Sequence, residues 1–276
     1  MVFFDEVITS KSNRNVINTA LLHDKKYRDL YCTFIAEGKK LFIEAVDCNV
    51  DICAVYIAES KKKDFSDMIY GIRDFRYAKT PVYTVSDDCF SKISTEKAPQ
   101  GIITVIKYLD NYKKYNIINI KDEEKLSDKA KKSLMLYDMQ DPGNLGSVIR
   151  SAAALGAERI IMSSGCADVF NTKTVRAAMG SLFRVELIEV SDFSGTVASL
   201  KKSGRRIFAA ELTDNAVSLD SISLLTSDIV IIGNEGHGIP KDISSACDRS
   251  LYIPIKGGVE SLNASVAAAI IMYAQK

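Results

Sequence analysis

Hydrophobic and polar positions in the first 109 residues alternate between the spacing of helices and that of strands. Between Arg14 and about Leu30, apolar residues recur at helical spacing, and an apolar run at 32–36 follows. The same alternation predicts helices over 38–48 and 64–75, and strands over 52–58, 81–85 and 101–108. Alternating helices and strands predict a small α/β sandwich, which we assign to residues 1–109.

A polar, charge-rich stretch then separates this region from the rest of the chain. We place a linker at 110–132, where the apolar run 117–120 interrupts the charged residues. Beyond it, apolar runs separated mostly by helical segments predict six strands, over 134–137, 159–162, 185–190, 206–210, 229–233 and 251–255. This pattern predicts a second α/β domain over 133–276, with a largely parallel sheet.

Composition narrows the class of protein further. With 276 residues, 47% hydrophobic and 26% charged, the chain is typical of a folded protein with two domains. No run of eighteen apolar residues occurs, and Asp5 and Glu6 stand where a signal peptide would be positive, so we expect a cytoplasmic protein without membrane partners. Six scattered cysteines and two histidines predict no metal site. The net charge of +1 leaves nucleic-acid binding to local basic clusters.

Three segments of the second domain carry candidate chemistry. In the first, 141–150, Pro142-Gly143 makes a turn after a strand and Asn144 is a candidate N-cap for the helix that follows. The apolar stripe of that helix leaves Arg150 outside it, near the end of a strand where open α/β sheets place ligands. A solvated arginine is the alternative interpretation.

The second and third segments follow later strands. In 231–240, three glycines and Glu235 follow a buried strand, but the spacing does not match a dinucleotide fingerprint, and a structural turn is the alternative. In 251–265, Ser261 and Asn263 precede a helix that is apolar on nearly all sides. Capping alone could explain these two residues, and such a helix belongs in a core or a subunit interface.

The order and content of these segments resemble the three motifs of the SpoU/TrmH family of RNA 2′-O-methyltransferases. The resemblance covers the chain from about Leu134 to its end, while 34–38, with Leu41 and Glu44-Ala45, resembles the family's N-terminal RNA substrate-binding domain. It implies S-adenosylmethionine as cofactor and a homodimer formed through the C-terminal domain. It also implies a SPOUT domain over 133–276, in which the end of the chain threads through a deep trefoil knot.

The resemblance also assigns the site residues. It implies catalytic roles for Asn144, Arg150, Glu235, Ser261 and Asn263. It implies that the cofactor is held, largely through backbone groups and apolar contact with adenine, by Leu212, Gly233, Asn234, Ile253, Ile255 and Leu262. A guanidinium holds its proton strongly and is therefore a poor general base. We therefore expect Arg150 to grip an RNA phosphate and stabilise the developing oxyanion, with deprotonation of the ribose as a second role.

Two further expectations concern partners. Glu235 is expected to orient Arg150 across a dimer interface, or else to hold its own loop. On the first domain, a phosphate-binding surface is expected from Lys11, Arg14, Arg28 and Lys39, with Lys25, Lys26 and Lys40 beside them. For each of these cations a solvated surface is the alternative.

The predicted function is S-adenosylmethionine-dependent methylation of a ribose 2′-hydroxyl, most simply in 23S, large-subunit ribosomal RNA. Transfer RNA is the alternative substrate, and a catalytically silent RNA-binding factor for ribosome assembly is the alternative class. A base methyltransferase is disfavoured because the segment from Asn144 to Arg150 resembles the ribose-modifying branch.

Overall fold

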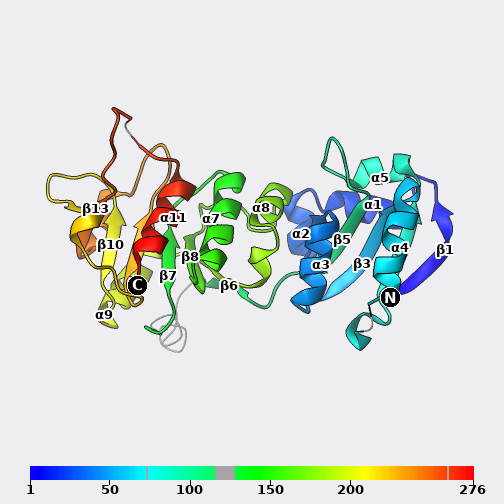
Figure 1. The fold of residues 1–276 in the computed structure, drawn as a ribbon, viewed down its shortest axis with the longest axis horizontal. Coiled ribbons are helices and arrows are strands. Elements are labelled where there is room, and N and C mark those ends of the chain that lie inside the picture. The colour runs from blue at the N-terminus through cyan, green and yellow to red at the C-terminus, as the bar shows by residue number, and fades with distance from the viewer. Residues whose placement is uncertain (73, 116–127, 260) are drawn as a thin grey trace. The chain divides into compact units, whose positions relative to one another are not determined.

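The computed structural model describes residues 1–276 apart from 73, 116–127 and 260 (Figure 1). The chain forms two compact units. The first consists of Met1–Leu109 and Phe170–Phe183, and the second of Asp110–Val169 and Arg184–Lys276. The predicted domain boundaries (1–109, 110–132 and 133–276) remain predictions.

The first unit is built on a mixed sheet of order β1-β4-β3-β5-β2. Its strands are β1 (Val2–Ile8), β2 (Thr33–Glu37), β3 (Ile52–Ala58), β4 (Pro81–Val85) and β5 (Ile102–Lys107). Its helices are α1 (Arg14–Leu21), α2 (Lys25–Tyr31), α3 (Lys39–Asp47), α4 (Lys62–Tyr70), α5 (Asp87–Ile93) and α8 (Thr172–Ala178). Successive β3 residues point to opposite faces, and Val55, Tyr56 and Ile57 are all buried, so helices cover both faces of this sandwich.

Several predictions for this unit are confirmed and others need correction. Strands 52–58 and 81–85 have the predicted bounds. The helix predicted from Arg14 to about Leu30 is two helices, because Asp24 caps a new one by accepting a hydrogen bond from the Lys26 N–H at 2.9 Å. The helix predicted over 64–75 ends at Tyr70. Strand β1 and helix α5 were not predicted.

The second unit contains an eight-stranded sheet of order β11-β13-β10-β12-β7-β8-β9-β6, in which every described pairing is parallel (Figure 1). Its strands are β6 (Tyr112–Tyr115), β7 (Ser133–Leu136), β8 (Arg159–Ser163), β9 (Glu186–Val190), β10 (Ile207–Ala210), β11 (Val217–Ser218), β12 (Ile229–Ile232) and β13 (Arg249–Tyr252). Its helices are α7 (Pro142–Ala154), α9 (Phe193–Lys202), α10 (Lys241–Ala246) and α11 (Ala264–Ala274). The largely parallel α/β sheet predicted for this region is confirmed.

Three details differ from the expectation for the second unit. The two-residue strand β11 was not predicted. Tyr112–Tyr115, inside the segment predicted as a linker, forms β6 and pairs with β9; residues 116–127 of that segment lie outside the described residues. The strand predicted over 251–255 lies at Arg249–Tyr252 instead. Ile253 and Ile255 therefore follow the strand and are available to line a cavity.

Lys132 ties two helix ends of the second unit together. Its ammonium donates hydrogen bonds to the carbonyls of Leu155, Met272 and Gln275 at 3.1, 2.6 and 2.9 Å. These carbonyls lie at the C-terminal ends of α7 and α11, where backbone oxygens lack helical partners and attract cations. The ammonium therefore holds the two helices, which also pack against each other, in a fixed relation.

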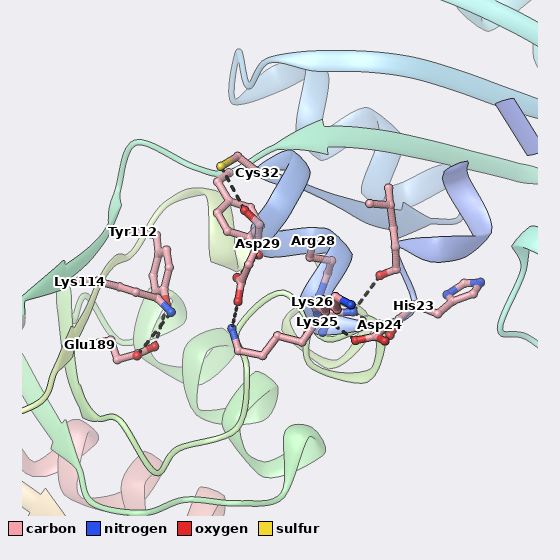
Figure 2. A network of polar contacts seen from close by, with 12 residues as sticks. His23, Asp24, Lys25, Lys26, Arg28, Asp29, Cys32, Tyr112, Lys114 and Glu189 are labelled. Atoms are coloured by element: carbon pink, nitrogen blue, oxygen red, sulfur yellow. Dashed lines mark hydrogen bonds and ion pairs between the residues drawn. The ribbon is translucent and has the colours of Figure 1, made fainter. Parts of the chain in front are cut away.

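Arg28 stabilises the turn between α1 and α2 (Figure 2). Its side chain is only 2% exposed, and its Nη1 donates to the carbonyls of Leu22 and His23 at 2.8 Å each. The prediction that Arg28 belongs to a phosphate-binding surface is therefore wrong, because its guanidinium is turned inward. Burial lowers the pKa of His23, and the neighbouring Arg28 charge lowers it further, while a backbone contact with Ile93 acts in the opposite direction.

These shifts predict a pH-dependent stability. The unfolded chain binds a proton at His23 near pH 6.5, whereas the folded chain resists protonation there. The free energy of unfolding should thus fall as the pH drops from about 6.5 through the lower folded-state pKa. Between pH 7.5 and 5.5, the free energy of unfolding should fall less for His23→Gln than for the unmodified protein, and urea denaturation measures it.

The matched control is His237→Gln, since His237 is exposed in a loop of the second unit. It should retain the full pH dependence. Identical pH profiles for His23→Gln and the unmodified protein would contradict the assignment.

Candidate active site and cofactor cavity

The parallel order of the second sheet brings distant loops to one edge. Strand β12 pairs with β7 on one side and β10 on the other, and parallel strands share the edge at which they end. The loops after Leu136, Ala210 and Ile232 therefore start close together, and they carry the first two predicted motif segments and part of the predicted cofactor set.

Helix α7 begins differently from the sequence expectation. Asp141 is its N-cap, accepting a hydrogen bond from the Asn144 N–H at 2.7 Å, and Pro142 opens the first turn. The prediction that Asn144 caps this helix is therefore wrong. Its side chain, instead of being used by the helix, is available for contacts with other segments.

A chain of hydrogen bonds links the three predicted motifs. The Asn144 Nδ2 donates to Glu235 Oε1 at 2.8 Å, and the Asn263 Nδ2 donates to Asn144 Oδ1 at 2.9 Å. The Asn263 Oδ1 in turn accepts from the Ser265 N–H at 2.9 Å, so Asn263 is the N-cap of α11. An ionised carboxylate can only accept, which fixes the orientation of both amides. Three segments far apart in sequence are thus joined through Asn144.

The loop that carries Glu235 is held by its neighbours. Asn234 and Gly238 exchange backbone hydrogen bonds at 2.9 and 3.1 Å, and the Asn234 Nδ2 donates to the Asp138 carbonyl at 2.8 Å. A Cβ at position 233 would lie 2.5 Å from the carbonyl carbon of Gly238, so this close approach requires glycine. Glu235 and His237 are both exposed on this loop.

A cavity of about 400 Å³ lies at the ends of β10 and β13 and against α11. The predicted cofactor residues in its lining are Leu212, Ile253, Ile255 and Leu262, together with Ser261 from the predicted catalytic set. Its remaining lining consists of Ala210, Glu211, Leu251, Tyr252, Val259, Ala267 and Ile271. Gly233 and Asn234 are not among these lining residues and lie on the Glu235 loop. Two of the lining residues, Ser261 and Leu262, directly precede Asn263 in the sequence. The cavity therefore adjoins the hydrogen-bonded chain.

The cavity is chemically suited to an adenine-bearing ligand. Its walls are mostly apolar, and Leu212 and Val259 remain 79% and 61% exposed at positions that a ligand would cover. Glu211 adds a carboxylate, which is held by the Ser250 hydroxyl at 2.7 Å. Glu211 was not among the predicted site residues, although its position directly after a strand end in the parallel sheet was a usable signal.

Arg150 lies in the middle of α7 with its side chain exposed. Within the described part of the chain it has no hydrogen bond or ion pair, and Glu235 bonds to Asn144. An exposed, unpaired guanidinium is free to bind an external anion. Orientation of Arg150 by Glu235 across a dimer interface stays a prediction.

The basic residues predicted to bind RNA, other than Arg28, are exposed on the first unit. Lys11 lies 3.6 Å from Asp88, while Arg14 and Lys39 form no ion pair with any described residue. Among the described residues, no group of three or more histidine, cysteine, aspartate or glutamate side chains could hold a metal ion. None of the helices described is long and apolar enough to cross a membrane.

The fold resembles solved RNA methyltransferases. An RNA methyltransferase of the TrmH family from Porphyromonas gingivalis matches with a TM-score of 0.77 and 26% identity, covering 95% of this chain and 97% of that one. An rRNA methyltransferase from Sinorhizobium meliloti, solved with S-adenosylmethionine bound, matches with a TM-score of 0.78 and 26% identity, covering 98% and 96%. Fold and site together thus define a class, the S-adenosylmethionine-dependent RNA methyltransferases.

Sequence comparison narrows this class to a family. The model of the SpoU rRNA methylase family matches residues 131–273, and that of the MRM3-like substrate-binding domain matches residues 13–104. The 23S rRNA (guanosine(2553)-2′-O)-methyltransferase RlmP of Bacillus subtilis strain 168 is 34% identical over 96% of this chain and 97% of its own length. The chain belongs to the SpoU rRNA methylase family.

The capping assignment predicts different effects on stability for two polar residues at the start of α7. Asp141→Ala removes the acceptor for a first-turn N–H of α7 and should lower the free energy of unfolding by about 0.5–2 kcal/mol. Ser147→Ala, at a half-buried position whose side chain forms no hydrogen bond with the described residues, should change it by less than about 0.5 kcal/mol.

Urea denaturation of both variants measures the difference. Ser147→Ala is the control, because Ser147 lies on the same helix and takes no part in its cap. Equal stability of the two variants would contradict Asp141 as the helix cap.

Proposed function

We propose that this enzyme transfers a methyl group from S-adenosylmethionine to a ribose 2′-hydroxyl of large-subunit ribosomal RNA. The supporting observation is the hydrogen-bonded chain from Glu235 through Asn144 to Asn263, which ends two residues after a cavity-lining serine. The similarity to RlmP over nearly the whole chain favours ribosomal RNA over transfer RNA. Intact polar groups at all three motifs argue against a catalytically silent assembly factor.

The cofactor residues follow from the cavity. When bound, S-adenosylmethionine supplies an electrophilic methyl group. Apolar side chains of Leu212, Ile253, Ile255 and Leu262 would enclose the adenine, and the Glu211 carboxylate can accept a hydrogen bond from a ribose hydroxyl. Gly233 and Asn234 would contribute through the backbone of their loop. The trefoil knot and the cytoplasmic location remain predictions.

Arg150 would act on the RNA. Its exposed guanidinium can form two parallel hydrogen bonds to a phosphate and place the 2′-hydroxyl for in-line attack on the methyl group. Its positive charge also favours the oxyanion that forms as the hydroxyl loses its proton. Because arginine keeps its own proton near neutral pH, the proton of the hydroxyl passes to solvent water in this scheme. Deprotonation by Arg150, which would first have to lose its own proton, is assigned only as a second role.

Substitution of Arg150 tests this proposal. Arg150→Ala should lower methyl transfer by about 100-fold or more, as loss of one hydrogen-bond donor to an oxyanion does in other enzymes. Arg150→Lys should recover only part of the rate, since lysine lacks the bidentate fork. The measurement is incubation with labelled S-adenosylmethionine and unmodified ribosomal RNA or bulk transfer RNA, followed by nuclease digestion and mass analysis of nucleosides.

The outcomes separate the alternatives. A 2′-O-methyl nucleoside from ribosomal RNA supports the proposal. A 2′-O-methyl nucleoside from transfer RNA alone would identify transfer RNA as the substrate instead. Cofactor binding without product on either RNA would point to an assembly factor. Near-normal turnover by Arg150→Lys would contradict the bidentate role.

We further propose a homodimer formed through α11. Val266, Ile270 and Tyr273 occur at helical spacing on this helix and are 47%, 36% and 79% exposed. An apolar stripe open to solvent is typical of a subunit interface.

Ile270→Glu places a charge within this stripe and should convert a dimer into a monomer. Sedimentation velocity measures the change. Ile43→Glu is the matched control, because Ile43 is 38% exposed on α3 of the first unit. A monomeric unmodified protein, or a dimer unaffected by Ile270→Glu, would overturn this interface.

A further inference from the structure

The first unit contains a second cavity that the proposed methyl transfer does not use. It measures about 440 Å³ and lies along β1, and we call it the edge cavity. Its lining is Phe4, Glu6, Val7, Ile8, Thr9, Ser10, Asn13, Asn15 and Tyr83. Strand β1 pairs in register with β4 up to Phe4 opposite Tyr83, and pairing resumes only at Ile8 opposite Val85. The extra residues form a bulge, and bulges often re-aim side chains at functional sites.

Stacked aromatic rings cross this end of the sheet. The rings of Phe4 and Tyr83 lie 5.0 Å apart at 18°, and those of Tyr83 and Tyr56 lie 5.3 Å apart at 29°. Exposure rises along the row, from 4% at Tyr56 to 47% at Phe4. The row therefore ends in a partly exposed aromatic ring at the cavity, which is the kind of surface on which unpaired nucleobases stack.

Polar groups beside the rings can recognise the edge of a base. Asn13 uses its Oδ1 to accept from the Asn15 N–H at 2.9 Å, and its Nδ2 has no partner among the described residues. The Asn15 side chain likewise forms no hydrogen bond within the described structure. Amides offer both donors and acceptors, which is what the edges of unstacked bases require.

Charge around the edge cavity favours one orientation of a nucleotide. Arg14, exposed and without an ion pair among the described residues, and Lys11 lie in the segment that borders the cavity. Glu6 lies in the lining itself and would repel a phosphate inside. A nucleotide with its base in the cavity and its phosphates toward Arg14 and Lys11 keeps the phosphates near these cations and away from Glu6.

We propose that the edge cavity binds one unpaired base of the RNA, stacked on Phe4. This inference rests on the proposed function in one respect, namely that the partner is RNA. The volume of about 440 Å³ is sufficient for a single small organic ligand such as a nucleoside. The cavity would hold a nucleotide other than the one that receives the methyl group.

Fluorescence of 2-aminopurine tests the proposal. The probe is a short single-stranded RNA with 2-aminopurine at its centre. Its fluorescence should be quenched when this base stacks in the edge cavity of the full-length protein. Phe4→Leu retains an apolar side chain without the ring and should weaken binding about five-fold or more, which is the lower end of the effect of losing one base–aromatic stack. The same variant should raise the KM for ribosomal RNA in the methylation assay.

The matched control is Phe75→Leu, because Phe75 is 89% exposed in the same unit and does not line the edge cavity. It should bind like the unmodified protein, and circular dichroism verifies the fold of both variants. Absence of quenching, or equal binding by both variants, would overturn the edge-cavity proposal. Methyl transfer that persists in that case leaves the proposed function intact, whereas quenching without methyl transfer contradicts only the proposed function.

Discussion

The site depends on the parallel pairing of β12 with both β7 and β10. Parallel strands start and end at common edges, so this pairing gathers loops that are distant in sequence. One consequence of this pairing is the hydrogen bond of 2.8 Å from the Asn234 side chain to the Asp138 carbonyl, two residues that are 96 positions apart in the sequence. All of β12 is buried, and a buried strand has one register that keeps its apolar side chains packed. The sheet therefore sets the position of the Glu235 loop relative to α7 before any side chain of the site contributes.

The hydrogen-bonded chain across the motifs has a direction that follows from its two ends. At one end, the free N–H groups at the start of α11 donate hydrogen bonds to the Asn263 Oδ1. The Asn263 Nδ2 is therefore the atom that donates to Asn144. At the other end, the Glu235 carboxylate can only accept. The positive end of a helix and a carboxylate thus face each other through two amides. Because this chain ends in a negative charge, it cannot by itself stabilise an oxyanion, and a cation such as Arg150 is needed for that purpose.

The sequence was informative where burial alone decides the structure. Strand 52–58 was predicted to the residue, because a continuous apolar run bounded by polar residues has few alternatives. Strand 81–85 was also predicted to the residue, because four of its five residues are β-branched or aromatic. Strand β1 was missed because Asp5 and Glu6 interrupt its apolar pattern. The cap of α7 was misplaced by three residues, although Asp141-Pro142 carries the stronger signal, a carboxylate followed by proline in the first helical turn.

Side-chain direction was much harder to predict. Arg28 has the sequence context of a surface cation, but the turn between α1 and α2 presents two carbonyls to it, and no local pattern reveals that geometry. The predicted strand 251–255 was shifted because Ile253 and Ile255 are apolar for a different reason, namely that they line a cavity. An apolar run does not distinguish burial in a sheet from burial around a ligand.

The ammonium of Lys132 connects these local features. Helix α7 carries Asn144 and Arg150, while α11 begins at the Asn263 cap and contributes Ala267 and Ile271 to the cavity wall. Both helices end at carbonyls that accept hydrogen bonds from this one ammonium. Methyl transfer is sensitive to the separation and alignment of donor and acceptor, so the helices that carry the two halves of the site must keep a constant relation. The Asn263–Asn144 bond at the start of the helices and Lys132 at their ends provide that constraint from both directions.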